Sequence, residues 1–168
     1  MRVLVTLLSC LLAAPVLAQD FLQQWRDSAI KGMNEFRAAH AAEIKAQGWR
    51  FIDGAVTAEG VPIADVFIKD VKAQDASTRS VRVLNAFYVP VSAADFPEYQ
   101  SSSALVWFHC ADGQYEHRRV DRYASIDGRG EPTSSDAKQP VEAPLEMKGA
   151  EPQSMAKTLA NAVCSSPL

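Results

Sequence analysis

Two cysteines that lie far apart in the sequence, Cys110 and Cys164, constrain the fold of this chain more than any other feature. Cys110 ends the apolar run "SALVWFHC", and Cys164 lies near the end of the helix-patterned segment "SMAKTLANAVCS". A disulfide between them would tie the tail of the chain to a strand in its middle. In the chain-entropy model such a bridge stabilises the folded state by roughly 4 kcal/mol. Whether the bridge forms depends first on the compartment in which the protein folds.

Residues 1–18 have the pattern of a secretory signal peptide. Arg2 precedes the apolar run "VLVTLLSCLLAAPVLA", and small residues at its end predict cleavage between Ala18 and Gln19. We therefore expect a periplasmic or secreted protein, with the cell surface as a further option, and not a cytoplasmic one. No membrane association is expected after cleavage. An uncleaved membrane anchor is the alternative, but the run is interrupted and short for a bilayer-spanning helix.

A third cysteine, Cys10, lies inside this leader, in "LLSC", where a bacterial lipoprotein would be cleaved. The apolar run continues past Cys10 to Ala18, so cleavage after Ala18 uses the whole run and removes Cys10. The exported chain then carries an even pair of cysteines in an oxidising setting, which favours a disulfide. A reactive thiol near His109 or His117 is an alternative. A zinc site is another, although zinc sites usually have four closely spaced ligands.

A long amphipathic helix is expected after the leader, from Asp20 to Gln47. Charged residues of both signs occupy most of its surface, and Gly48 is a suitable stop. The apolar residues of this helix form one narrow stripe along it. Such a stripe is typical of core packing, with a partner helix or a membrane surface as alternatives. We interpret His40, which lies on it, as a packed histidine rather than a ligand. The stripe recurs at three- and four-residue intervals and comprises Leu22, Trp25, Ala29, Met33, Phe36, His40 and Ile44.

The middle of the chain is rich in β-branched and aromatic residues, which predicts strands. Asp112 and Gly113 form a turn signal that should pair the flanking strands as a hairpin. The connections are too short for crossover helices, so the sheet should be antiparallel. Apolar residues occupy both faces of several strands, which indicates a sheet covered on both sides by the two helices. We expect strands at 49–53, 61–71, 80–91, 103–110 and 114–123, with a short last strand around 125–131.

The remainder of the chain contains a linker and a final helix. Prolines and polar residues at about 130–151 predict a mobile linker. Met155, Leu159 and Val163 are spaced as one face of a helix over 154–165. The chain should therefore comprise a signal peptide (1–18), an N-terminal amphipathic helix (19–48) and one α+β domain (49–168). That domain would hold an antiparallel sheet of about five or six strands.

The order of these signals resembles the surface-adhesin protein E family of bacterial envelope proteins. The resemblance covers residues 49–165 and is carried by "WRFID", by the Cys110-centred "WFHC", by the basic strand followed by "SIDGRGE", and by the closing "NAVC". It implies a twisted antiparallel sheet with the C-terminal helix tied to it by the Cys110–Cys164 disulfide. It also implies adhesion to host extracellular-matrix proteins, with haem binding proposed as well. The founding adhesin is a cell-surface lipoprotein, from which this leader differs.

We therefore predict a non-enzymatic binding module of adhesin type. Its partner would be another protein or, by the resemblance alone, a host extracellular-matrix protein. An alternative is a periplasmic accessory or inhibitor protein that acts on another envelope protein through its N-terminal helix. A cluster of basic residues is our candidate ligand patch. The alternative interpretation is that these residues form a solvated strand face whose charge is balanced by Glu116 and Asp121. This basic cluster consists of His117, Arg118, Arg119 and Arg122.

Other function classes lack support in the sequence. The net charge of −3 does not favour a nucleic-acid partner. The chain has no nucleophile elbow, no His-Glu-x-x-His and no glycine-rich phosphate loop, so we assign no catalytic residue and no enzyme class. Cys-x-x-Cys-His, which c-type haem attachment requires, is also missing. We expect no metal site and no cofactor.

Overall fold

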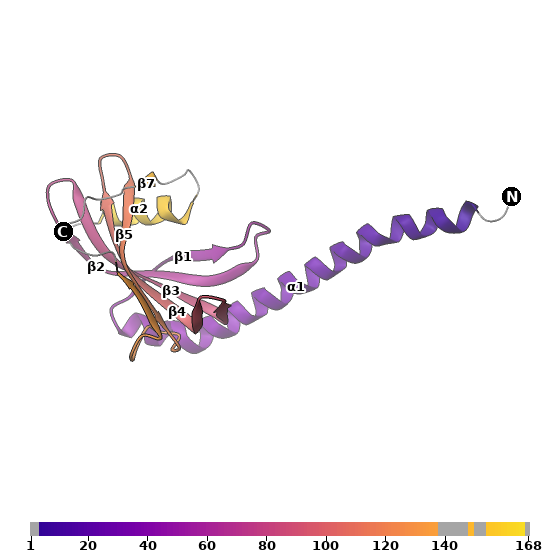
Figure 1. Cartoon of the computed structure of the whole chain (residues 1–168), viewed down its shortest axis with the longest axis horizontal. Helices are drawn as coiled ribbons and strands as arrows, with labels where there is room; N and C mark the ends of the chain where they lie inside the picture. Colours follow the sequence, from indigo (N-terminus) through magenta and orange to yellow (C-terminus); the bar gives the residue numbers. More distant parts are fainter. Residues whose placement is uncertain (1–3, 138–147, 150–153, 167–168) are drawn as a thin grey trace.

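The computed structural model of this chain describes residues 4–137, 148–149 and 154–166. One long helix leads into a sheet, and a short helix ends the described chain (Figure 1). The elements in order are α1 (Leu4–Ala46), β1 (Arg50–Val56), β2 (Pro62–Ala73), β3 (Thr78–Ala93), β4 (Phe96–His109), β5 (Gln114–Tyr123), β6 (Ser134–Ala137), β7 (Lys148–Gly149) and α2 (Met155–Cys164). The α+β class is confirmed.

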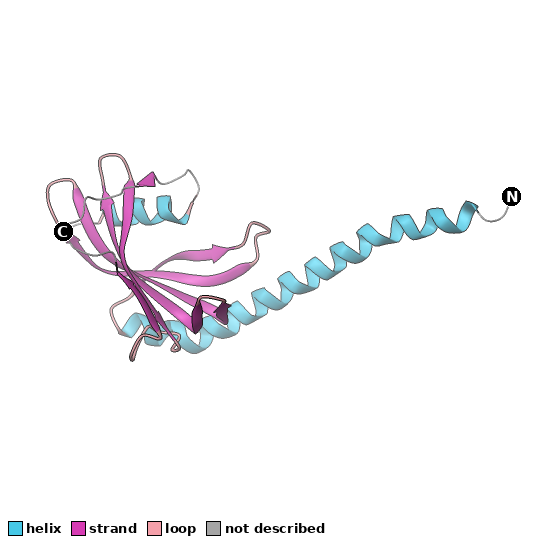
Figure 2. Ribbon diagram, in the orientation of Figure 1, coloured by secondary structure: helices cyan, strands magenta, loops and turns pink. Residues whose placement is uncertain are grey.

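The sheet is an antiparallel meander, in which each strand from β1 to β6 pairs with the next one along the chain. The two-residue β7 pairs with β5 off this path. The predicted hairpin is confirmed, since β4 and β5 pair with His109 opposite Gln114. Gly113 in its turn has φ of 71°, a left-handed conformation that glycine adopts at little cost. Figure 2 shows the strong twist of the sheet.

Two separate cores cover the two faces of the sheet, and the helices lie on opposite sides of it (Figures 1 and 2). Alternate residues of each strand point to opposite faces, so adjacent residues join different cores. On the face of α2, Phe108 and Val163 are fully buried. On the face of α1, Leu84 is fully buried with Ile44. The expectation of a sheet covered on both sides is confirmed.

The amphipathic stripe of α1 divides into a packed half and an exposed half. Phe36 and Ile44 are buried against the sheet, whereas Trp25 is 45% exposed. Phe21, which lies outside the stripe, is 68% exposed. Figure 1 shows the N-terminal part of α1 running far beyond the sheet. The helix ends as predicted, because Gly48, with φ of 84°, turns the chain into β1. The predicted helix is confirmed and is longer than expected, beginning at Leu4.

One sequence prediction in the C-terminal part, the short last strand, was wrong. The segment 125–131 is a loop rather than a strand, and Ser125 closes it by accepting a hydrogen bond from Arg129 N–H at 2.9 Å. Gly128 and Gly130, both with positive φ, keep it out of the sheet. The sixth strand is β6, inside the predicted linker of about 130–151, and β7 also lies there. Residues 138–147 and 150–151 of that linker lie outside the described residues.

Candidate functional site

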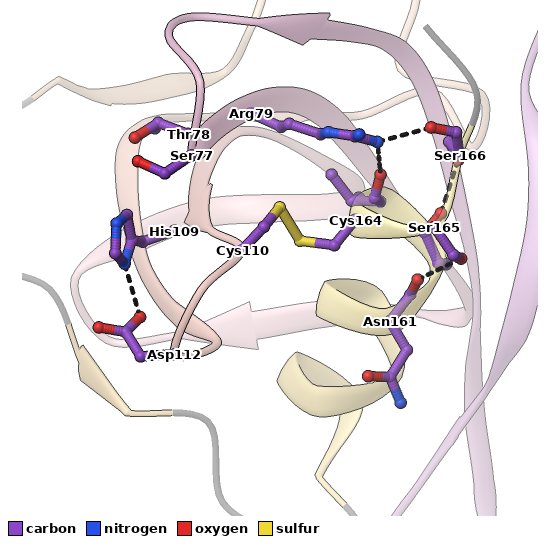
Figure 3. The surroundings of a disulfide bond; sticks show 12 residues. Ser77, Thr78, Arg79, His109, Cys110, Asp112, Asn161, Cys164, Ser165 and Ser166 are labelled. Carbon is purple, nitrogen blue, oxygen red and sulfur yellow. Dashed lines mark hydrogen bonds and ion pairs between the residues drawn. A yellow bond between two sulfur atoms is a disulfide. The ribbon is translucent and has the colours of Figure 1, made fainter.

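The disulfide between Cys110 and Cys164 joins the turn after β4 to the last residue of α2 (Figure 3). Their Cα atoms are 5.5 Å apart, a normal separation for a disulfide. Cys110 is also held by its backbone, because its N–H donates to Ser77 O at 2.8 Å. The bridge that the cysteine count predicted is therefore present, and it closes a loop with a sequence separation of 54.

A second attachment holds the same end of α2. Arg79 of β3 donates from Nη1 to Val163 O at 2.8 Å and to Ser166 O at 2.6 Å (Figure 3). These carbonyls follow or end the helix, where backbone acceptors lack partners within the helix and the dipole favours a cation. The C-terminal end of α2 is thus fixed covalently and electrostatically, although a linker precedes the helix.

The structure separates the predicted basic cluster onto two faces of β5. Val106 opposes His117 and Leu105 opposes Arg119, which leaves Arg118 as an extra residue in a β-bulge. His117 shares a small pocket with the α2 side chains, whereas Arg119 lines a pocket on the opposite face. The four residues therefore do not form one continuous patch.

Carboxylates of β5 itself neutralise two of the arginines of this cluster. Arg118 is 8% exposed and lies 3.1 Å from Glu116 Oε2, with its guanidinium over the Trp107 ring. Arg119 donates from Nε to Asp121 Oδ2 at 2.8 Å. A ligand role for the cluster stays a prediction, and Arg119, whose side chain is 55% exposed, is its most accessible arginine.

Arg122, the fourth member, belongs to a different surface that we call the aromatic–arginine cluster. Its guanidinium carbon lies 3.7 Å from the ring centroid of Phe96 and 5.8 Å from that of Tyr99, within the range of cation–π contacts. Tyr99 in turn contacts Phe87 edge to face, with ring centroids 5.7 Å apart. The three rings are half-buried. Asp136 of β6 holds Arg122 Nη1 at 2.7 Å.

A further site, the helix–hairpin pocket, lies between the last turns of α1 and the β1–β2 hairpin. Its volume is about 680 Å³, a size usual for small-molecule pockets. Phe67 and Trp49 form buried walls, and Phe51 forms a wall that is 48% exposed. Phe51 and Phe67 meet edge to face at 5.6 Å. The helix contributes Ala41, whose small side chain leaves the space open.

Charges in this pocket are arranged around a buried carboxylate. Asp65 is 1% exposed and accepts from Arg37 Nη2 at 2.6 Å and from Tyr88 Oη at 2.7 Å. Its hydrogen bonds raise the pKa of the Arg37 guanidinium. Burial, and then the hydrogen bond to Asp65, raises the pKa of the Tyr88 hydroxyl. Asp65 is thus satisfied within the protein, while the exposed side chain of Lys45 supplies positive charge at the rim. Arg50 also lines the pocket, but its Nη2 donates to Ser166 Oγ at 3.2 Å, beside α2.

Sequence reasoning did not predict this pocket. The motif "WRFID" was noted as a strand start, and it supplies Trp49, Arg50 and Phe51 to the lining. The pocket also depends on the pairing of Arg37 with Asp65. No local sequence pattern predicts a contact between residues so far apart in the sequence. The predicted cleavage site between Ala18 and Gln19 lies inside α1 and stays a prediction.

Comparisons with known proteins give one match. The family model for surface-adhesin protein E matches residues 64–165, which is more than half of the chain. No curated protein and no solved structure matches this chain. Within the described residues, no helix combines the length and the apolar character needed to span a membrane. The described residues also hold no group of three His, Cys, Asp or Glu side chains that could bind a metal ion.

Proposed function

This chain belongs to the surface-adhesin protein E family, and from that premise we propose that it is an exported, non-enzymatic envelope protein that binds another protein. The matched residues 64–165 include β3, β4 and both ends of the disulfide. A sheet with a helix tied to it by a disulfide is a suitable scaffold for a binding surface outside the cytoplasm, where disulfides persist.

One observation carries the choice of surface, namely the aromatic–arginine cluster of Phe87, Phe96, Tyr99 and Arg122. It lies entirely within the matched residues. Aromatic residues and arginine are enriched at the centres of protein interfaces, because they bury large area and form directed contacts. Nearby on β3, Val89 is 68% exposed. A protein partner that covers the cluster would bury these half-exposed rings.

The experiment for this surface is capture of the purified protein on immobilised extracellular-matrix proteins. We expect Tyr99→Ala to weaken capture by about tenfold or more, as truncation of an interface aromatic does. Phe51→Ala, at the helix–hairpin pocket, is the matched control and should leave capture unchanged. Arg119→Glu tests the basic cluster in the same assay. Equal capture of wild type and Tyr99→Ala would overturn the choice of this surface.

Export is tested separately. We expect N-terminal sequencing of the mature protein to begin at Gln19, and cell fractionation to place it outside the cytoplasm. Protease added to intact cells distinguishes surface exposure, which gives digestion, from a periplasmic location, which gives protection. Protection would rule out surface adhesion and would favour an accessory role inside the envelope.

A second candidate function rests on α1. Phe21 is 68% exposed and Trp25 is 45% exposed, so both are available to a partner. This supports an accessory or inhibitor protein that acts through its N-terminal helix. Replacing Phe21 and Trp25 with serine should abolish partner capture under this hypothesis and should leave it intact under the first.

A further inference from the structure

We propose that the helix–hairpin pocket binds a single-chain anionic amphiphile, with the apolar chain against its aromatic walls and the carboxylate or phosphate headgroup at its cationic rim. This activity goes beyond protein binding. Seven of the nine lining residues, including all those from α1 and β1, precede residue 64, where the family match begins. The matched residues therefore supply only Asp65 and Phe67 to the pocket.

The walls select an apolar ligand. Trp49 is 4% exposed and Phe67 is 2% exposed, so these rings are held in place by the core behind them. Phe51 stands against Phe67 yet leaves nearly half of its surface in water. An apolar chain in the pocket would remove this surface from water, which is favourable in proportion to the area buried.

The charges select an anionic end. Among the described lining residues the single carboxylate is Asp65, which is buried and engaged by Arg37 and Tyr88. The exposed charged groups of the lining, Lys45 and Arg50, are both cationic. Arg50 already donates from Nη2 to Ser166 Oγ at 3.2 Å, so Lys45 is the cation that we assign to the headgroup. Within the described part of the chain, no ion pair joins Lys45 to a carboxylate. A headgroup with negative charge would gain a partner there, and a cationic headgroup would be repelled.

The pocket suits a small amphiphile better than an added peptide strand. A peptide would need the free edge of β1, which is interrupted by register shifts after Phe51 and after Ala55. In addition, the Gly54 N–H donates to Asp53 Oδ1 at 2.8 Å. Bulges and charged side chains of this kind protect edge strands against pairing.

The test is isothermal titration calorimetry of the purified, disulfide-bonded protein with three amphiphiles of equal chain length, below their micelle concentrations. Laurate and dodecyl phosphate should both bind, and dodecyltrimethylammonium should bind at least about tenfold more weakly because the rim is cationic. Tighter binding of laurate would assign a fatty-acid type of ligand, and tighter binding of dodecyl phosphate a lysophospholipid type.

Two variants locate the binding. Ala41→Phe fills the pocket from the helix side and should abolish binding, which separates the pocket from any adsorption on α1 or the leader. Lys45→Glu should weaken laurate binding by at least about fivefold, since it reverses an exposed charge. Lys157→Glu, an equal charge change on exposed α2 surface, is the control. Binding that is unchanged in Ala41→Phe, or equal affinity for the anionic and cationic amphiphiles, would overturn the proposal.

Discussion

Arg37 of α1 and Asp65 of β2 form a bidentate ion pair, with Nη2 and Oδ1 2.6 Å apart and Nε and Oδ2 3.0 Å apart. The Asp65 side chain is 1% exposed, whereas that of Arg37 is 37% exposed. The pair therefore fastens the long helix to the sheet at the floor of the helix–hairpin pocket. It also fixes the position of the Tyr88 hydroxyl, which donates to the same carboxylate.

Removing the cation from this pair should destabilise the domain. We expect Arg37→Met to lower the free energy of unfolding by about 2 kcal/mol, because Asp65 stays buried after losing its charged partner. Urea denaturation followed by circular dichroism measures this. Lys31→Met, which removes the exposed pair with Glu35, should cost less than about 0.5 kcal/mol. Equal costs for the two variants would contradict a structural role for the Arg37–Asp65 pair.

Reduction of the disulfide should destabilise the protein by roughly 4 kcal/mol, because the bridge restricts a long loop in the unfolded chain. Guanidinium denaturation with and without reductant gives the difference. A protein with Cys110→Ser and Cys164→Ser should behave like the reduced wild type. If reductant has no effect on the denaturation midpoint of the wild type, the disulfide does not stabilise the attachment of α2 to the sheet.

Arg79 should matter most when the disulfide is absent. We expect Arg79→Ala to cost about 2 kcal/mol, since two carbonyls at the end of α2 lose a charged donor. Arg79→Ala should increase the rate of hydrogen exchange of the α2 amides, and the increase should be larger when the disulfide is reduced than when it is intact. Arg82→Ala, on the exposed surface of the same strand, is the control. Equal exchange rates of the α2 amides in Arg79→Ala and Arg82→Ala would show that Arg79 does not hold the end of α2.

Stability should fall in alkaline solution because of Tyr88. Burial, with the hydrogen bond to Asp65, raises the pKa of this hydroxyl in the folded state. The unfolded chain therefore releases the proton first, and its contribution to stability, present below pH of about 10, is lost as the pH rises further. Tyr88→Phe should flatten the dependence of the denaturation midpoint on pH between neutral and alkaline solution. An unchanged slope would show that Tyr88 does not govern it.

The local sequence determined much of this architecture. Segments rich in β-branched and aromatic residues predicted β2 to β5, and Asp112-Gly113 predicted the β4–β5 hairpin. The spacing of Met155, Leu159 and Val163 predicted α2. These elements follow from periodicity within short segments, which the chain carries wherever it folds. The cysteine pair, together with the leader, predicted a long-range contact, the Cys110–Cys164 disulfide, because two cysteines in an exported chain are expected to pair.

Tertiary structure alone decided how the distant segments meet. It placed Arg37 on Asp65, divided the basic cluster by the bulge at Arg118, and brought Arg122 onto Phe96. It also paired β6 with β5, although "SSDA" has no strand pattern, because the neighbouring strand supplies the hydrogen bonds. Such contacts depend on the twist and register of the whole sheet. No local pattern contains that information.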